Sequence, residues 1–351
     1  MTDRLVDALI DSGLPLERSV LEPASRRMLR SEAPLAEPDM AIAAVDALVG
    51  LGPLEPLLRD PLVSDVVVNA DGAVWVERAG ELAPATVRFE PPEAVVAAVE
   101  RVIAPLGLRL DRASPAVDAR LPDGSRLHAI VPPASVDGPV VAVRRFTAAV
   151  PDLAAMVDAG SVDPEGAELL RVAVTERRNL LVVGSTGTGK TTLLNALSKE
   201  VPGTERLVTV EVAAELRLAG HVVRLEARPP NAEGVGEITL RTLVRHALRL
   251  RPDRLIVGEV RGPEALDMIQ AMSTGHDGSM STMHANGPEE ALWRLETLAL
   301  SGAARVAEST VRRQIRSAVD LVVEVRRRPR RRVVSSIVAV SDDGLQELWR
   351  C

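Results

Sequence analysis

The stretch from residue 184 to residue 191 reads Gly184-Ser185-Thr186-Gly187-Thr188-Gly189-Lys190-Thr191. It fits the pattern G-x-x-x-x-G-K-[ST] of a phosphate-binding loop. An apolar run over 180–183 precedes it and is typical of a buried strand, and residues 192–197 follow with the apolar spacing of a helix. In a strand–loop–helix unit the loop amides and the helix N-terminus face a polyanion. The stretch therefore predicts a nucleoside triphosphate site in an α/β fold.

The pattern also assigns roles within this loop. Lys190 is expected to reach the β- and γ-phosphates, and the hydroxyl of Thr191 to ligate Mg²⁺. Thr192 opens the helix and completes the set of residues expected to line the phosphates. The alternative, a chance turn rich in Gly, Ser and Thr, does not account for correct flanks on both sides.

Composition and length set the class of protein. With 351 residues, 46% hydrophobic and 26% charged, the chain has room for two ordinary domains. No run approaches the roughly 18 to 20 apolar residues of a membrane span, and the first residues lack the features of a signal peptide. We therefore expect a cytoplasmic protein. Its one cysteine, Cys351, excludes an intramolecular disulfide and a cysteine-based zinc site.

Charge is distributed unevenly along the chain. The formal net charge is −7, yet residues 326–332 contain six arginines in seven positions. Such a run favours either a solvated or partner-docking segment or a contact with nucleic-acid phosphates. The chain has three tryptophans, two phenylalanines and no tyrosine, and single-stranded nucleic acid is usually held by aromatic stacking. Nucleic acid is therefore the disfavoured partner.

Element patterns divide the chain into four parts. Residues 1–50 have helical apolar spacing, and 51–146 alternate short strands, turns and one helix over 91–104, which predicts a mixed α+β domain. Residues 147–160 are expected to form a linker. From 161 to 351, strand-like runs at 207–211, 222–225 and 254–258 alternate with helical segments. This alternation predicts a mostly parallel sheet with helices on both faces.

Two further segments carry candidate catalytic groups. Glu259 ends the apolar run that starts at Arg254, and ligand sites of parallel sheets lie at the carboxyl ends of strands. There it can polarise an attacking water or hold the water shell of a metal ion. Residues 273–286 are expected to form a polar loop, in which His284 can donate a hydrogen bond to a phosphate.

Taken in order, these motifs resemble the traffic ATPases of bacterial secretion and pilus assembly, the type II/IV secretion superfamily. The phosphate-binding loop alone is unspecific. The Gly258-Glu259 ending, followed by Thr274-Gly275-His276 and His284-Ala285-Asn286, is highly specific. The similarity starts at Leu51 and is closest to the ATPase of Tad/Flp-type pilus systems. The family branch with a tetracysteine zinc insertion is excluded, since the cysteines are absent.

The resemblance implies a hexameric ring of RecA-like domains, with ATP and Mg²⁺ bound between the N- and C-terminal domains. It implies that Glu259 activates water and that His284 links the γ-phosphate to domain movement. It also implies that arginines of the N-terminal domain reach the phosphates; the candidates are Arg120, Arg126, Arg144 and Arg145. Arg228, Arg241 and Arg261 are weaker candidates. The ring would act on an inner-membrane platform protein, so membrane association would be through partners.

One position departs from the family pattern. The aspartate box usually reads Glu-Asp, whereas Glu211 is followed here by Val212. Glu211 stays a candidate catalytic residue, and the loss of the second acid puts the hydrolysis rate in doubt. Two alternative functions therefore remain open. One is a nucleic-acid motor for conjugal transfer or DNA uptake, and the other is a nucleotide-gated scaffold with little hydrolysis.

Overall fold

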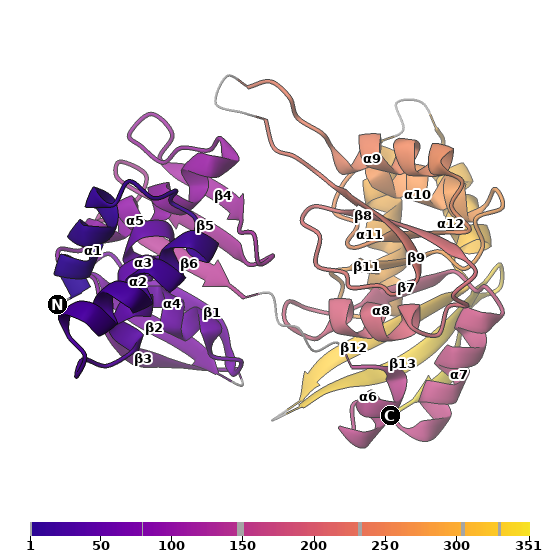
Figure 1. The fold of residues 1–351 in the computed structure, drawn as a ribbon. Coiled ribbons are helices and arrows are strands. Elements are labelled where there is room, and N and C mark those ends of the chain that lie inside the picture. The colour runs from indigo at the N-terminus through magenta and orange to yellow at the C-terminus, as the bar shows by residue number, and fades with distance from the viewer. Residues whose placement is uncertain (1, 79, 146–150, 231–233, 303–305, 329–330) are drawn as a thin grey trace. The chain divides into compact units, whose positions relative to one another are not determined.

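The computed structural model describes residues 2–78, 80–145, 151–230, 234–302, 306–328 and 331–351. The chain divides into two compact units, Met1–Ala148 and Ala149–Cys351. Figure 1 draws the first unit in indigo to purple and the second from magenta to yellow. Within the described residues no helix combines the length and apolarity that crossing a bilayer requires.

The first unit begins with a small helical bundle. Its helices are α1 (Thr2–Asp11), α2 (Arg18–Glu32) and α3 (Asp39–Val49). Leu5, Leu21 and Val45 are fully buried between them, in a core separate from that of the following sheet. These apolar positions recur at helical spacing, so each helix buries one apolar stripe.

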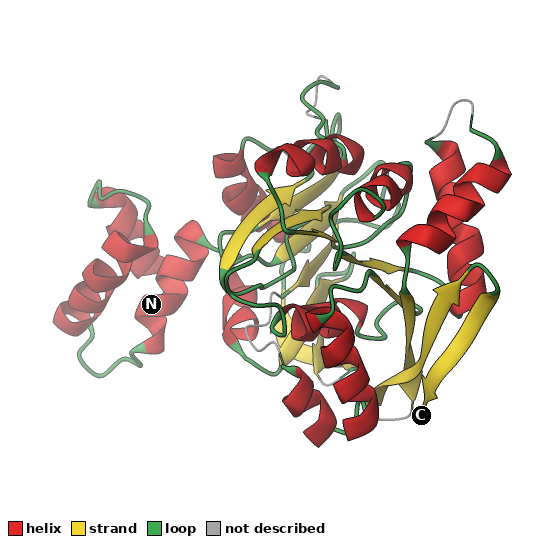
Figure 2. Ribbon diagram, turned by 90° about the vertical axis from the view of Figure 1, so that its right-hand side faces the viewer, coloured by secondary structure: helices red, strands yellow, loops and turns green. Residues whose placement is uncertain are grey.

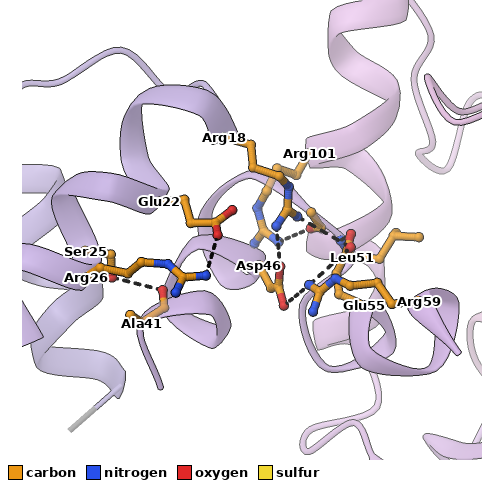
Figure 3. A network of polar contacts seen from close by, with 11 residues as sticks. Arg18, Glu22, Ser25, Arg26, Ala41, Asp46, Leu51, Glu55, Arg59 and Arg101 are labelled. Carbon is orange, nitrogen blue, oxygen red and sulfur yellow. Dashed lines mark hydrogen bonds and ion pairs between the residues drawn. The ribbon is translucent and has the colours of Figure 1, made fainter. Parts of the chain in front are cut away.

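An ionic joint connects this bundle to the next helices (Figure 3). Asp46 of α3, whose side chain is 3% exposed, accepts a hydrogen bond from Arg18 at 2.7 Å and another from Arg59 of α4 (Glu55–Arg59). Arg101 of α5 (Ala94–Ile103) donates to the carbonyl of Gly50 at 2.9 Å. The bundle is thus held to the rest of the unit by charged groups as well as by chain connectivity.

A six-stranded antiparallel sheet forms the rest of the first unit, in the order β3-β2-β1-β6-β5-β4. Its strands are β1 (Val63–Val68), β2 (Ala73–Arg78), β3 (Glu81–Arg88), β4 (Ala116–Arg120), β5 (Arg126–Ile130) and β6 (Val140–Arg144). Alternate residues such as Val66 and Val68 are fully buried, and Val95 and Val99 of α5 pack in the same core. The unit is therefore the mixed α+β structure that the strand and turn signals predict.

The second unit contains an eight-stranded sheet in the order β14-β13-β12-β7-β11-β10-β8-β9. Its strands are β7 (Leu180–Val183), β8 (Arg206–Glu211), β9 (His221–Glu226), β10 (Arg254–Val257), β11 (Met280–Met283), β12 (Leu321–Arg328), β13 (Arg331–Ser341) and β14 (Gly344–Arg350). The strands from β12 to β9 run parallel, while β13 and β14 pair antiparallel. This mostly parallel sheet confirms the predicted α/β class.

Helices cover both faces of this sheet, as Figure 2 shows in red against yellow. They are α6 (Leu153–Asp158), α7 (Pro164–Thr175), α8 (Lys190–Ser198), α9 (Leu240–Ala247), α10 (Glu264–Met272), α11 (Pro288–Ser301) and α12 (Glu308–Ala318). Residues of α6 to α8 form one apolar core with the sheet, and residues of α9 to α12 form the other. Two-sided burial explains why β7 is apolar throughout, and β10 apolar after its first residue Arg254, rather than alternating.

The segment expected as a linker, 147–160, is only partly irregular. Residues 147–150 lie outside the described part of the chain, and Leu153–Asp158 forms helix α6. Asp152 caps it, because its carboxylate accepts a hydrogen bond from the amide of Ala155 at 2.8 Å. The helix buries Leu153 and Met156 in the core of the second unit, so this part belongs to that unit.

Candidate functional site

The phosphate-binding loop joins β7 to α8, as the sequence pattern requires. Its backbone is left-handed at Gly187 (φ 72°) and at Gly189 (φ 97°), where glycine is favoured. At Gly184 a Cβ atom would lie 2.3 Å from the carbonyl oxygen of Val325, so only glycine fits. The Thr188 hydroxyl donates to the carbonyl of Ser185 at 2.9 Å and ties the loop together. The loop has the tight, preformed shape that a phosphate cradle needs.

Lys190 opens α8 and is only 7% exposed. Its ammonium donates to the carbonyl oxygens of Gly184 and Ser185, both at 3.0 Å, and lies 3.2 Å from Nδ1 of His284. Burial and the nearby Arg261 lower the pKa of Lys190, and Glu259 partly opposes them. The loop's own carbonyls thus hold a cation at the position where phosphate oxygens are expected to bind it.

Glu259 and His284 follow the neighbouring parallel strands β10 and β11. His284 Nε2 lies 3.2 Å from Oε1 of Glu259, and Arg261 donates to Oε2 of Glu259 at 2.7 Å. A chain of polar contacts therefore runs from Lys190 through His284 and Glu259 to Arg261. The structure brings the predicted groups together because the carboxyl ends of β7, β11 and β10 share one edge of the sheet.

The surroundings of these groups set their ionisation. Burial raises the pKa of Glu259, but the hydrogen bond and charge of Arg261, together with His284 and Lys190, outweigh it and leave that pKa below its usual range. Burial and the charge of Lys190 lower the pKa of His284, against the pull of Glu259. A neutral imidazole can accept from Lys190 at Nδ1 while Nε2–H faces Glu259. Glu259 is therefore an ionised acid at neutral pH.

Glu211 ends β8, beside the Gly258 that precedes Glu259. A Cβ on Gly258 would lie 2.8 Å from Cγ of Glu211, so the two strands approach closely here. Oε1 of Glu211 accepts from the amides of Glu215 and Leu216, both at 2.8 Å, whereas no described residue donates to its buried Oε2. Burial raises the pKa of Glu211 to about 7, against those two hydrogen bonds. The following Val212 is 46% exposed.

The expectation of a polar loop over 273–286 is wrong in its middle. Met280–Met283 forms β11, a buried strand between β7 and β10. Its hydroxyls are satisfied internally: Ser281 donates to the carbonyl of Val257 at 2.8 Å, and Thr282 to that of Gly258 at 2.6 Å. A buried hydroxyl without a partner costs about 1–3 kcal/mol, and these bonds offset that cost. The polar residues Ser281 and Thr282 therefore led to a loop being predicted where the structure has a central strand.

Thr191 is the predicted Mg²⁺ ligand, and it follows Lys190 on the first turn of α8. Among the described residues no group of three or more His, Cys, Asp or Glu side chains is arranged to hold a metal ion. A single hydroxyl ligand such as that of Thr191 fits Mg²⁺, which keeps several waters and is bound by few protein groups together with phosphates. Thr191 with Glu259 acting through water is consistent with such an ion.

The candidate arginines of the first unit lie on three adjacent strands. Arg126 of β5 pairs in register with Arg120 of β4 on one side and with Arg144 of β6 on the other. Arg145 differs, because its guanidinium donates to the carbonyls of Asp60 and Val63, the latter at 2.8 Å. The structure thus groups three of the four candidates, and it gives the fourth partners inside its own unit.

The weaker candidates separate clearly. Arg261 belongs to the site through its hydrogen bond to Glu259. Arg241 donates to Asp267 at 2.7 Å, and Arg228 to the carbonyl of Gly236 at 2.8 Å. The arginine run over 326–332, of which 329–330 lie outside the described residues, forms a hairpin of β12 and β13. This hairpin contacts the phosphate-binding loop and is thereby connected with the site. No sequence motif predicts that contact.

Comparison with known proteins gives a consistent result. The family described as type II/IV secretion system protein matches residues 47–336. A Mycobacterium tuberculosis protein provisionally named a conjugal transfer protein is 44% identical over 80% of this chain and 81% of its own length. The type IV secretion system protein PtlH of Bordetella pertussis is 35% identical over 80% of this chain and 91% of its own.

A solved structure agrees with the fold. The ATPase DotB of Legionella pneumophila superposes with a TM-score of 0.59 at 19% identity, over 83% of this chain and 80% of its own. At this low sequence identity, the superposition shows similarity of fold alone. The family match, by contrast, spans most of the chain and includes the loop, Glu259 and His284. The chain belongs to the type II/IV secretion system protein family.

Proposed function

We propose that this chain is an ATPase that hydrolyses Mg²⁺-ATP within a pilus-assembly or protein-secretion machine. The observation that carries the proposal is the polar chain at the carboxyl edge of the sheet. Lys190 Nζ lies 3.2 Å from His284 Nδ1, and His284 Nε2 lies 3.2 Å from Glu259 Oε1, beside a preformed phosphate-binding loop. Strand ends of a parallel sheet are where nucleotide chemistry is found in such folds.

Each residue of the site has a role that follows from its charge or hydrogen-bonding groups. Lys190 exchanges the carbonyls of Gly184 and Ser185 for phosphate oxygens when nucleotide binds. Glu259, ionised at neutral pH, orients a water toward the γ-phosphate, and His284 reports the presence of that phosphate. Bound Mg²⁺ neutralises phosphate charge, with the Thr191 hydroxyl as its protein ligand. Positioning and charge stabilisation suffice, so no covalent intermediate is required.

The first unit and the assembly belong to the same proposal. Arg120, Arg126 and Arg144 supply positive charge to the nucleotide, and hydrolysis drives a conformational change in a hexameric ring. That ring acts on an inner-membrane platform, which also recruits the protein to the inner face of the cytoplasmic membrane. We propose a Tad/Flp-type pilus as the system, because the sequence as a whole resembles the ATPase of such systems most closely.

A nucleic-acid motor for conjugal transfer is the second candidate. The provisional name of the mycobacterial relative and the exposed arginines of the β12–β13 hairpin favour it. Against it stands the shortage of aromatic side chains, with three tryptophans and two phenylalanines in the sequence. DNA that stimulates hydrolysis at low salt, with the effect lost at high salt, would favour this candidate over the first.

The test is steady-state Mg²⁺-ATP hydrolysis at several protein concentrations. Glu259→Gln should bind ATP but turn over at least about tenfold more slowly, which is about 1.4 kcal/mol in the barrier. Glu289→Gln is the matched control, because Glu289 is an exposed acid at the start of α11. A wild-type rate that rises more than in proportion to concentration supports an active ring.

Two results would overturn the proposal. If Glu259→Gln hydrolyses ATP as fast as the wild type, Glu259 is not the activating acid. If the wild type binds ATP but shows no rate above that of Glu259→Gln at any concentration, the protein is a nucleotide-gated scaffold, and Val212 marks the lost turnover.

A further inference from the structure

The hairpin of β12 and β13 extends beyond the end of β7 and runs beside the phosphate-binding loop. β12 pairs with β7 from Leu321 to Glu324, where β7 ends at Val183. It then continues for four more residues, Val325–Arg328, paired with β13. The carbonyl of Val325 lies so close to Gly184 that a Cβ there would be 2.3 Å from it. The hairpin therefore packs on the first residue of the loop.

Arg332 of this hairpin packs on the last glycine of the loop. A Cβ built on Gly189 would lie 3.4 Å from Cδ and 3.9 Å from Cβ of Arg332, and 4.0 Å from Cβ of Thr192. The stem of Arg332 therefore crosses the loop just before Lys190. From Cδ onward its guanidinium has a reach of a few ångströms, comparable with the length of one charge-assisted hydrogen bond.

Strand alternation decides which arginines share this face. Arg332 pairs in register with Arg327, and Val334 with Val325. Successive side chains of a strand point to opposite faces, so these four lie on one face. Val325 and Val334 pack in the core that contains residues of α8, which is the side of the loop. Arg331 falls on the other face, and its guanidinium approaches Gly160 instead.

The charges on this face are left uncompensated. Like charges directly opposite each other on paired strands are destabilising. Within the described part of the chain, the side chains of Arg327 and Arg332 make no hydrogen bond and no ion pair. Their neighbours differ, since Arg326 donates to Glu324 at 2.8 Å and Arg328 to the carbonyl of Cys351 at 3.4 Å. Arg327 and Arg332 thus place two unpaired positive charges beside the phosphate-binding loop, where a bound anion would reduce their repulsion.

We propose that Arg332, supported by Arg327, is a further nucleotide-binding residue that contacts the diphosphate part of the nucleotide. The inference rests on the proposed nucleotide binding and deepens it. The loop amides hold the α- and β-phosphates, whereas Lys190 reaches the β- and γ-phosphates. Arg332 packs on Gly189, and among the described residues no hydrogen bond or ion pair joins it to His284 or Glu259 at the γ-phosphate end. It therefore binds ADP and ATP alike.

The test compares the binding of ADP and ATP, each carrying a fluorescent ribose label, by full-length variants. Arg332→Ala should weaken both nucleotides by a similar factor of about ten or more, since a hydrogen bond to a charged group is lost. Arg332→Lys keeps the charge without the planar fork and should fall between the two. Arg331→Ala, on the opposite face of the same hairpin, should stay within about twofold of the wild type.

Thermal unfolding separates a ligand contact from a structural role. Removing one of two repelling arginines should leave the melting temperature without nucleotide unchanged or slightly raised. The rise that saturating ADP produces in the wild type should shrink in Arg332→Ala, because stabilisation by a ligand follows its affinity. A lower melting temperature without nucleotide, with the ADP-induced rise intact, would show a structural role and overturn the proposal.

Other outcomes are equally decisive. Unchanged ADP affinity in both Arg332 variants overturns the inference, as does a loss confined to ATP, which would move Arg332 to the γ-phosphate. If Arg331→Ala and Arg332→Ala lose DNA-oligonucleotide binding equally while ADP binding is unchanged, the arginine run binds nucleic acid.

The variant Lys190→Ala distinguishes a failure of this inference from a failure of the proposed function. If it loses ADP while Arg332→Ala does not, only this inference fails. If the wild type itself binds no nucleotide, the proposed function fails.

Discussion

Folding buries Glu211 and raises the pKa of its carboxyl group. Unfolded, its pKa is near 4.5, and folded it is raised to about 7. The folded state therefore holds this proton more tightly than the unfolded state does. The stability that the proton contributes is fully present below pH 4.5 and is lost as the pH rises through 7. The shift corresponds to about 3 kcal/mol when taken over that whole range.

Glu211→Gln should remove this pH dependence. The amide keeps an oxygen for the amides of Glu215 and Leu216 and cannot ionise. The free energy of unfolding of the variant relative to the wild type should therefore rise by up to about 3 kcal/mol between pH 5 and pH 8. Urea unfolding of nucleotide-free protein at both pH values measures it. Parallel pH curves for the two proteins would contradict the prediction, and Glu289→Gln should give such parallel curves.

Residue-level prediction from the sequence works where a motif has fixed spacing. Lys190 and Glu259 could be assigned because each follows an apolar run that becomes a strand of one parallel sheet. Their connection through His284 and Arg261 could not, since it depends on side-chain directions at three strand ends. The arginine at position 332 carries no motif at all, and only the register of two strands brings it to Gly189.

At the scale of elements, the helical bundle α1–α3 depends on the ionic joint around Asp46 (Figure 3). Asp46 is nearly buried, whereas its partners Arg18 and Arg59 are 38% and 44% exposed in their side chains. Water screens the arginines, so this is neither a fully buried pair nor a surface pair. Its loss should cost less than that of a fully buried pair.

Asp46→Asn should lower the free energy of unfolding of the first unit by about 1–2 kcal/mol, because Asn keeps one acceptor oxygen but loses the negative charge and the second oxygen that bind Arg18 and Arg59. Chemical denaturation of the full chain measures the change. Asp39→Asn, at the exposed start of the same helix, is the control and should cost under about 0.5 kcal/mol. Equal effects in the two variants would mean that the joint contributes nothing specific.

Elements with one dominant period were predictable. The apolar runs of β7 and β10 and the hairpin of β1 and β2 follow directly from sequence. Strand β11 was not predictable, because Ser281 and Thr282 interrupt its apolar pattern. Their hydroxyls donate to the carbonyls of Val257 in β10 and of Gly258, and the sequence does not reveal these partners. Helix α6 was missed for a simpler reason. It is short, and only the cap at Asp152 marks its start.

At the scale of the whole molecule, we propose that residues of both units serve nucleotide binding. The second unit holds the loop and the acid, and in the first unit Arg120, Arg126 and Arg144 lie on adjacent strands. Arg145 serves the first unit itself, through the carbonyls of Asp60 and Val63. The four candidates are therefore expected to behave as two classes.

Substitution should separate these classes. Arg126→Ala is expected to slow ATP turnover at least about tenfold, since it removes a charge-assisted contact with the nucleotide. Arg145→Ala is expected to destabilise the first unit by about 1–3 kcal/mol, because two carbonyls lose their donor. Turnover and urea unfolding, measured on both variants, give the comparison. The reverse assignment, with Arg126 structural and Arg145 catalytic, would refute this division of roles.

The place of β7 in the sheet has a consequence for how the protein is made. Its two neighbours, β11 and β12, lie about 100 and 140 residues later in the chain. When the strand before the loop leaves the ribosome, neither neighbour has been synthesised, and non-local pairing of this kind is slow. The nascent chain therefore carries an apolar strand without its partners until β11 and β12 have been made. The interval before β12 emerges is the stage at which this strand is exposed to aggregation.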